Sequence, residues 1–473
     1  MGNKVELVKS PPEAGLPRLF DLAAETVGPA IIACVDNGAE LVRDRENDSR
    51  GRGMGEQTTT ETELVAGGGL LHRRALLGGG ALAASAATAQ AAGIGERSPQ
   101  TMTRPGQPMS AYGNPSPRRQ GVQRLVATSP GRAGTGVSRT PMHQLEGSIT
   151  PNGLHFERHH NGVPDIDPER HQLLIHGLVR RPLSFSLETL LQYPMETHVR
   201  FIECAGNSGG MVAPEPSQAN AGVLHGLISC SEWTGVPLSV LLDEAGVDRR
   251  ARWMLAEGAD AAGMSRSVPL AKCLDDAVIA LFQNGEPIRP EQGFPMRLLL
   301  PGYEGNISVK WLRRLKLTAE PTFTRDETSR YSDLLRNGQA ELFTLPMGVK
   351  SVITRPSFGL SMRGPGLYEI SGLAWSGHGR VARVEVSADG GASWAEAALT
   401  PPVQSMALTR FRIPWRWDGG AVTLMARASD ERRNRQPSRA EWLAKYAPGQ
   451  IFHFNAVQSW RVGADGQVSH VYA

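Results

Sequence analysis

Between residues 145 and 318 short apolar runs are separated by polar or glycine- and proline-rich turns. The strand-length runs are HQLLIHGLV, HVRFIEC, RWMLAEG, AVIALFQ, FPMRLLLP and VKWLRRLKLT. Two stretches, Ser186–Leu191 and Ser239–Ala245, instead show the spacing of amphipathic helices. Because strands and helices are mixed in this way, we expect an α+β domain over residues 141–335.

After about residue 340 the pattern becomes one of strands alone. Val384 and Val386 alternate with charged neighbours, DGG at 389–391 is typical of a hairpin turn, and FRIPWRW and VTLMARASD continue the pattern. Regularly spaced turns predict an all-β sandwich of immunoglobulin type over residues 340–465. A sandwich by itself indicates no chemistry, since binding modules, adhesion domains and dimerisation domains all use one.

The first part of the chain has a different character. LHRRALLGGGALAASAATAQAA, at 71–92, places Arg73-Arg74 before a weakly hydrophobic stretch with A-x-A sites. Three consecutive glycines argue against an ordinary helix, and the pattern is typical of a twin-arginine export signal. We therefore expect an upstream extension and signal over residues 1–92, a periplasmic protein, and an extended arm over residues 93–140; the start codon can be Met1 or Met54.

Length and composition narrow the class further. A chain of 473 residues, 40% of them hydrophobic, can bury two cores. Its formal net charge of +3 suits an anionic substrate or acidic partner, and no arginine-rich tract with interleaved aromatics indicates nucleic acid. No apolar run is long enough to span a membrane. The four cysteines form no CxxC or CxxCH, which argues against c-type haem, iron–sulfur clusters and structural zinc.

One cysteine stands in an unusual setting. FIECAGNSGG, at 201–210, offers Cys204 from a loop of glycines and an asparagine directly after a strand-like run. Such a loop lets the backbone approach a bulky ligand, and a thiolate suits a soft metal; the alternative is a buried small hydrophobe. Three histidines, His155, His159 and His160, suggest zinc as another possibility, but they do not form HExxH and a glycine and a proline follow them.

Several stretches together resemble one family. FIECAGN, ERHHNGVP, GFPMRLLLPGYEGNISVKWL and GLAWSGHGRVARVEVSADGGASW are similar, in order, to the sulfite oxidase family of molybdenum enzymes, over residues 140–460. Within it, TPNGLHFERHHNGVPDIDPERH and HGLISCSEWTGVPLSVLLDEAGV most resemble the sulfane dehydrogenases of thiosulfate-oxidising systems. Those enzymes work with a separate c-type cytochrome subunit, which agrees with the absence of CxxCH here.

The resemblance implies a molybdenum–molybdopterin cofactor and a set of site residues. Cys204 matches the thiolate ligand of molybdenum, Arg158 the arginine beside the substrate anion, and Tyr331 the active-site tyrosine, whose phenol is a hydrogen-bond donor. The residues that match contacts to the pterin and its phosphate are His160, Asp260, Arg297 and Lys310.

Departures from the family pattern bear on the substrate. Sulfite-oxidising members carry arginines where this chain has Ser208-Gly209-Gly210, and Asn-Leu-Arg where it has Asn455-Ala456-Val457. Losing a charged hydrogen bond disfavours free sulfite by about 1–3 kcal/mol and leaves room for a larger substrate. Gln292 replaces a histidine near the pterin, and His159 replaces an asparagine. Cys230 and Cys273 match no catalytic position and are expected to pack.

These observations predict a periplasmic molybdenum oxidoreductase that oxidises sulfane sulfur on a cysteine of a carrier protein and passes electrons to a c-type cytochrome subunit. The alternative enzyme is a sulfite dehydrogenase acting on free sulfite. A third hypothesis, from another class, is a cofactor-free binding or adhesion protein built on the sandwich. We expect a homodimer or hetero-oligomer; the nucleotide form of the pterin stays open.

Overall fold

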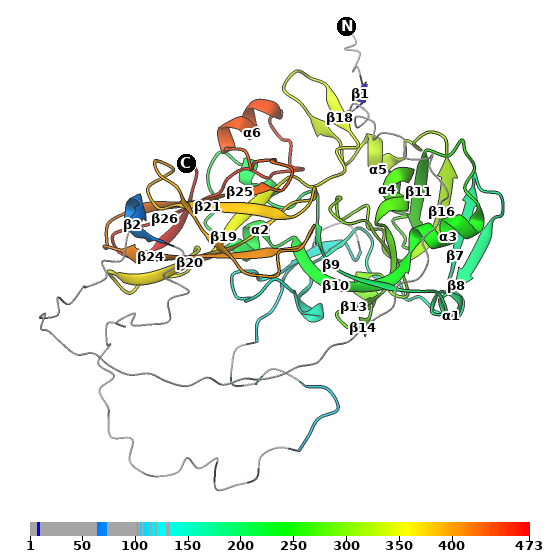
Figure 1. Cartoon of the computed structure of the whole chain (residues 1–473), viewed down its shortest axis with the longest axis horizontal. Coiled ribbons are helices and arrows are strands. Elements are labelled where there is room, and N and C mark those ends of the chain that lie inside the picture. Colours follow the sequence, from blue (N-terminus) through cyan, green and yellow to red (C-terminus); the bar gives the residue numbers. More distant parts are fainter. Residues whose placement is uncertain are drawn as a thin grey trace, which may run out of the picture. The chain divides into compact units, whose positions relative to one another are not determined.

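The computed structural model describes residues 7–9, 64–72, 121–128 and 133–473, with short stretches between 102 and 118. These elements belong to one compact unit made of residues 1–10 and 62–473 (Figure 1). The predicted signal, from Arg73 to Ala92, and most of the predicted arm lie outside the described residues. None of the helices in the described ranges is long and apolar enough to cross a bilayer.

A five-stranded antiparallel sheet carries the loop of Cys204. Its order is β14-β13-β10-β9, and β15 also pairs with β13. Strand β9 ends in three buried residues, Phe201 to Glu203, so the chain enters the Cys204 loop from inside the protein. The strands are β9 (Glu196–Glu203), β10 (Ile228–Pro237), β13 (Val278–Gln283), β14 (Glu286–Pro287) and β15 (Arg297–Leu299).

A second five-stranded sheet lies in the same predicted domain, in the order β12-β11-β16-β7-β8, with β16 and β7 parallel. Helix α3 packs on its core through leucines and an alanine at helical spacing, and Gly246, with φ of 70°, ends it. The elements are β7 (Gln172–Gly177), β8 (Leu183–Ser186), β11 (Trp253–Gly258), β12 (Ser265–Pro269), β16 (Leu312–Thr318), α3 (Leu238–Ala245) and α4 (Leu270–Asp275).

Two small sheets flank these larger ones. Strands β4 and β5 form a hairpin that adds to β6 and places Val137 opposite Arg158. The end of the predicted arm is therefore a strand that orders a site residue. The other small sheet has the order β1-β18-β17. The strands of these two sheets are β1 (Leu7–Lys9), β4 (Leu125–Thr128), β5 (Gly136–Arg139), β6 (Glu157–His159), β17 (Asp333–Leu334) and β18 (Ala340–Leu342). Three short helices also belong to this half of the protein: α1 (Leu187–Leu190), α2 (Ala221–His225) and α5 (Arg325–Thr328).

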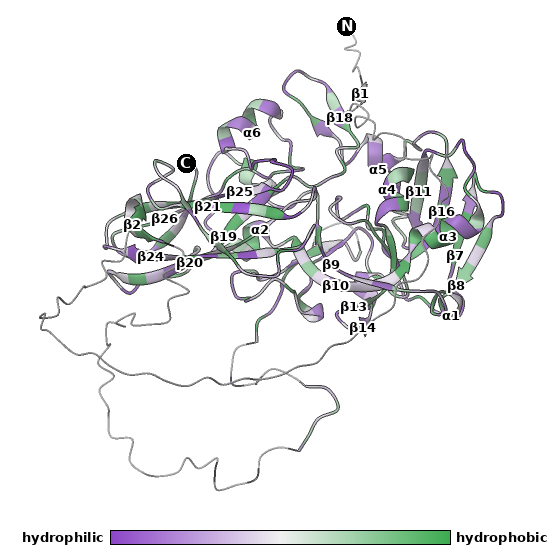
Figure 2. Ribbon diagram, viewed as in Figure 1, coloured by the Kyte–Doolittle hydropathy of each residue, from purple (hydrophilic) through white to green (hydrophobic). Residues whose placement is uncertain are grey.

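The C-terminal domain consists of two sheets that share one hydrophobic core, whose apolar positions alternate along the strands in Figure 2. Their orders are β19-β20-β24-β3-β2, with β23 beside β24, and β22-β21-β25-β26-β27. The elements are β2 (Leu64–Ala66), β3 (Leu70–Leu71), β19 (Lys350–Arg355), β20 (Gly366–Trp375), β21 (Val381–Ser387), β22 (Ala395–Glu396), β23 (Ala398–Leu399), β24 (Thr409–Trp417), β25 (Val422–Asp430), β26 (Ser459–Val462), β27 (Val468–Val471) and α6 (Arg439–Lys445).

Mixed α+β structure followed by a β-rich domain is thus confirmed, whereas the immunoglobulin topology stays a prediction. Strand β3 comes from the predicted upstream extension, yet Leu70 and Leu71 are buried in the C-terminal domain. Cys230 and Cys273 are fully buried in two different cores, which agrees with their predicted packing role.

Candidate active site

One cavity is lined by all the site residues expected from the sequence. Arg158 and His160 come from β6 and the residue after it, and the others come from five further segments, at or near the end of a strand or in a connecting loop. These residues are Arg158, His160, Cys204, Asp260, Arg297, Lys310 and Tyr331. The fold therefore joins positions that are far apart in the chain, and the spacing along the sequence gives no measure of this proximity.

The Cys204 loop is fixed by its own hydrogen bonds. The Cys204 amide donates to the Leu227 carbonyl at 2.9 Å, and the Asn207 amide donates to the Cys204 carbonyl at 2.8 Å. Burial raises the pKa of the Cys204 thiol, which a backbone hydrogen bond from Gly206 and the charge of Arg158 only partly oppose. A metal cation would outweigh that effect, because a coordinated thiol is deprotonated.

Glu203, the residue before this cysteine, forms a buried ion pair with Lys350. Glu203 accepts hydrogen bonds from Lys350 Nζ at 3.2 Å, Trp375 Nε1 at 2.7 Å and Asn207 Nδ2 at 2.9 Å. Lys350 and Trp375 belong to the C-terminal domain, so that domain holds the loop directly. Lys350 also donates to Ser208 Oγ at 2.7 Å.

Two basic side chains, the buried Arg297 and the half-buried Lys310, line the same part of the cavity. Arg297 donates to the carbonyls of Gln292 at 3.0 Å and Ser308 at 2.9 Å, and burial lowers its pKa to about 9. Burial, helped by the charge of Arg297, lowers the pKa of Lys310 to about 7; its Nζ donates to the Glu291 carbonyl at 3.1 Å. Among the described residues neither cation forms an ion pair within 4 Å, so an anionic ligand would supply the missing charge.

Unsatisfied polar atoms in the same part of the cavity fit a phosphate-bearing pterin. Within the described part of the chain, Arg297 Nε and His155 Nε2 are buried without a hydrogen-bond partner. A buried polar atom left unpaired costs about 1–3 kcal/mol, which a bound group with donors and acceptors would relieve. Arg297, Lys310 and Asp260 would hold the pterin and its phosphate, and Cys204 would ligate the metal.

The histidines do not form a zinc site. His155 Nδ1 bonds the Phe156 carbonyl at 3.1 Å, whereas His159 bonds Glu157 at 2.7 Å and Lys310 at 2.9 Å. Throughout the described ranges, no three His, Cys, Asp or Glu side chains group as metal ligands. Burial, together with Arg158 and other cations, lowers the pKa of His160 to about 3, so this side chain is neutral.

Arg158 lines the cavity together with Cys204. Its guanidinium donates to the Gly136 carbonyl at 3.4 Å and to the His159 carbonyl, and its charge lowers the pKa of Cys204. No carboxylate pairs with it in the described residues. A substrate anion beside Cys204 would therefore find a planar donor already oriented by strand β6.

Tyr331 occupies an unusual backbone conformation, with φ of 45°. The guanidinium of Arg266 lies 4.9 Å from the centre of its ring, and the ring of Phe452 lies 5.3 Å away. Burial raises the pKa of the phenol well above its usual value. The phenol is therefore protonated and able to donate a hydrogen bond at neutral pH.

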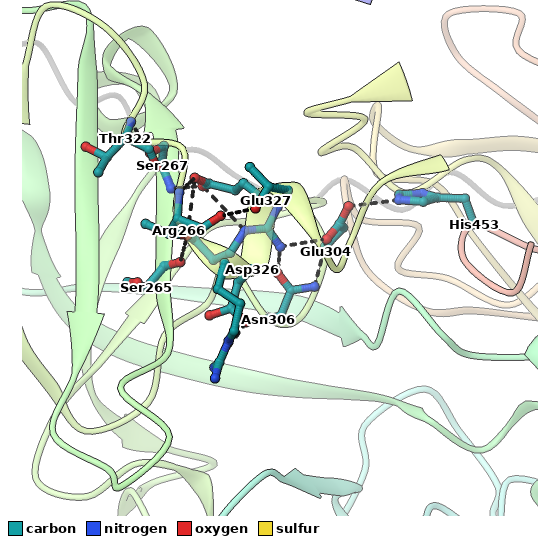
Figure 3. A network of polar contacts seen from close by, with 12 residues as sticks. Ser265, Arg266, Ser267, Glu304, Asn306, Thr322, Asp326, Glu327 and His453 are labelled. Carbon is teal, nitrogen blue, oxygen red and sulfur yellow. Dashed lines mark hydrogen bonds and ion pairs between the residues drawn. The ribbon is translucent and has the colours of Figure 1, made fainter. Parts of the chain in front are cut away.

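Sequence reasoning missed the polar network behind this tyrosine (Figure 3). Arg266, Glu304 and His453 are buried and bonded to one another in series. Glu304 lies in the conspicuous stretch 291–315, which offered a weak signal. The family pattern at Asn455-Ala456-Val457 indicated that the C-terminal domain comes near the substrate, but nothing singled out Phe452 or His453.

The room expected at the two glycines of the Cys204 loop is not found in the cavity. A side chain at Gly209 would come within 2.9 Å of the Ile451 carbonyl, so the C-terminal domain fills that space. At Gly210 a side chain would meet nothing within 4 Å, but Gly210 is exposed and does not line the cavity. Gln292 still donates to the Phe156 carbonyl at 3.0 Å and accepts from Arg297, so it orders the cation that faces the cavity.

Comparison with known proteins agrees with this geometry. Residues 160–325 match the oxidoreductase molybdopterin binding domain, and residues 342–459 match the Mo-co oxidoreductase dimerisation domain. The crystal structure of the sulfane dehydrogenase SoxCD from Paracoccus pantotrophus superposes with a TM-score of 0.76 and 41% identity, covering 80% of this chain and all of that one.

Curated relatives extend the comparison. Mitochondrial sulfite oxidase of Mus musculus is 29% identical over 374 residues, which cover 73% of this chain and 66% of that protein. Inducible NADH nitrate reductase 2 of Glycine max is 32% identical over 350 residues, 64% of this chain and 39% of that protein. The chain thus spans just under two thirds of the first relative and much less of the second. It belongs to the sulfite oxidase family of molybdenum enzymes and uses their molybdenum–molybdopterin cofactor.

Proposed function

We propose that this protein is a molybdenum dehydrogenase that oxidises sulfane sulfur bound to a cysteine of a carrier protein. The observation that carries the proposal is that Arg158 lines the cavity with Cys204, while Ser208, Gly209 and Gly210 stand where sulfite-oxidising members of the family carry arginines. Similarity to a sulfane dehydrogenase structure supports the same choice. Electrons would leave to a separate c-type cytochrome subunit, and the C-terminal domain would join protomers or that subunit.

The chemistry divides between cofactor and protein. The bound molybdenum centre supplies two-electron redox chemistry; each oxygen added to sulfur comes from water, with release of two protons and two electrons. Arg158 would bind the oxyanion that develops on sulfur. The protonated phenol of Tyr331 would donate a hydrogen bond at the reacting oxygen, and neutral His160 adds no competing charge.

Kinetics with two substrates test this assignment. We expect carrier-bound sulfane to be oxidised with a far higher kcat/KM than free sulfite, with cytochrome c reduction as the measured signal. Comparable kcat/KM values for both substrates would instead favour the sulfite dehydrogenase alternative.

A gain-of-charge variant sharpens the test. Gly210→Arg adds a cation at an exposed position of the Cys204 loop where sulfite-oxidising members carry arginines, and Gly210→Gln is the neutral control of similar length. A new charged hydrogen bond of about 1.5–3 kcal/mol would lower KM for sulfite by roughly 10-fold or more in the arginine variant alone. Equal KM values for the two variants would show that charge at this position does not select the substrate.

We also propose export by the twin-arginine pathway, on the pattern around Arg73-Arg74. Cleavage after the A-x-A sites would remove β3, whose Leu70 and Leu71 are buried in the C-terminal domain. N-terminal sequencing of the periplasmic protein tests this: a start near residue 93 is expected. Recovery of a protein that retains residues 64–71 would contradict cleavage at these sites.

A further inference from the structure

The ring of Tyr331 is contacted by side chains from both domains. Arg266 of strand β12 places its guanidinium 4.9 Å from the ring centre, and Phe452 of the C-terminal domain packs at 5.3 Å with an interplanar angle of 42°. A bulky residue with positive φ, like Tyr331, persists only where its surroundings fix it. These two contacts are the means by which the surroundings hold the ring.

Arg266 is linked to the C-terminal domain through Glu304. It is fully buried and donates to one oxygen of Glu304 at 3.0 Å, with Glu327 at 3.6 Å from its Nε. The other oxygen of Glu304 binds His453 Nε2 at 2.8 Å (Figure 3). Because buried charges tolerate little displacement from their partners, the position of His453 is passed on to Arg266 and hence to the ring.

The segment that carries these residues is fastened to the Cys204 loop. The His453 amide donates to the Ala205 carbonyl at 3.0 Å, and its φ of 54° shows a second constrained backbone. A side chain at Gly206 would lie 4.0 Å from the Phe452 ring, and one at Gly209 would meet Ile451. The absence of a side chain at Gly209 lets the segment approach this closely, whereas a Cβ at Gly206 would make only an ordinary contact with the ring.

We propose that residues 451–455 of the C-terminal domain pack behind the cavity-lining Tyr331 and position it, directly through Phe452 and indirectly through His453, Glu304 and Arg266. Phe452 and His453 are positioning residues, since they act through the tyrosine. The inference rests on the proposed function, in which the Tyr331 phenol donates to the reacting oxygen.

A double-mutant cycle tests the inference. Phe452→Leu is made in the wild type and in Tyr331→Phe, and steady-state kinetics are measured on material of equal molybdenum content. In the wild type we expect kcat to fall about 10- to 100-fold, as for a misplacement of about 1 Å, with KM nearly unchanged. In the Tyr331→Phe background, which lacks the hydroxyl, the same substitution should change kcat less than twofold.

His453 gives a second, independent arm. His453→Ala removes the donor to Glu304 and should lower kcat, whereas His453→Gln keeps a donor and should restore most of it. The matched control is His470→Gln, which alters another buried histidine of the C-terminal domain, bonded instead to the Ser217 carbonyl. Wild-type kcat is expected for this control.

The outcomes separate cleanly. Equal losses from Phe452→Leu in both backgrounds, or the same loss from His470→Gln, would overturn the proposal, because the effect would then be general loosening of the domains. If the wild type oxidised neither sulfur substrate, the proposed function would fail instead. The crystal structure of Phe452→Leu would still decide the positioning role: a displaced Tyr331 ring is expected, and an unmoved ring refutes it.

Discussion

Lys350→Met removes the only cation that binds Glu203 in the described residues. Lys350 and Glu203 are 2% and 1% exposed, and their charged atoms lie 3.2 Å apart. After the substitution, Glu203 keeps its neutral donors from Asn207 and Trp375 but loses its counter-charge. An uncompensated buried charge of this kind costs about 3–5 kcal/mol in unfolding free energy. The cost falls on the residue next to Cys204, so weaker retention of molybdenum is also expected.

Two further variants serve as controls for the expected loss of unfolding free energy in Lys350→Met. Lys445→Met removes a cation at the same 3.2 Å distance from Glu341, but this lysine side chain is 51% exposed, so solvent screening limits the loss to about 1 kcal/mol. Glu203→Gln combined with Lys350→Met removes both charges and should recover most of the stability, because a buried pair is often nearly neutral in net effect.

Urea unfolding followed by tryptophan fluorescence measures all of these variants, with metal content determined on the same samples. The expected order of stability is wild type, Lys445→Met, the double variant, then Lys350→Met. If the free energy of unfolding of Lys350→Met lay within about 1 kcal/mol of the wild-type value, the Lys350–Glu203 ion pair would not contribute the stability that its burial indicates. A double variant as unstable as the single one would assign the loss to packing.

Three other predictions concern the cofactor and the network behind Tyr331. Cys204→Ser should purify with little molybdenum, whereas Cys230→Ser should keep the wild-type amount; equal content by elemental analysis would remove Cys204 as the ligand. Arg297→Gln should weaken retention of the pterin about 10- to 100-fold by loss of a charged hydrogen bond, measured as fluorescence of the released pterin after dialysis, and unchanged retention would contradict the phosphate contact. Burial lowers the pKa of His453. Its hydrogen bond to Glu304 and the charges of Glu304 and Asp333 outweigh burial, so the pKa is raised overall. The stabilisation by the His453–Glu304 ion pair is therefore complete below about pH 6.5 and is lost as the pH rises through the raised pKa. The difference in unfolding free energy between wild type and His453→Gln should shrink between pH 6 and pH 9. A difference that stays constant would refute the ion pair.

Much of the site was predictable because its residues sit in local patterns. Cys204 follows a strand-like run and precedes glycines, and Arg297 and Lys310 lie in one conspicuous stretch, but their roles came from the resemblance to the sulfite oxidase family. The loop at Gly209 shows the limit of such reasoning. Its missing side chain indicated free space, but the space is occupied by the Ile451 carbonyl, more than two hundred residues later in the chain.

The amino-acid order alone determined which residues form strands, because alternation and turn residues act over a few positions. It also determined which residue types were present for a thiolate ligand and an anion-binding end. Only the tertiary structure decided that Glu203 is held by Lys350 and Tyr331 by Phe452. Those contacts depend on how two separately patterned domains pack, and no local pattern encodes the position of a partner on the other domain.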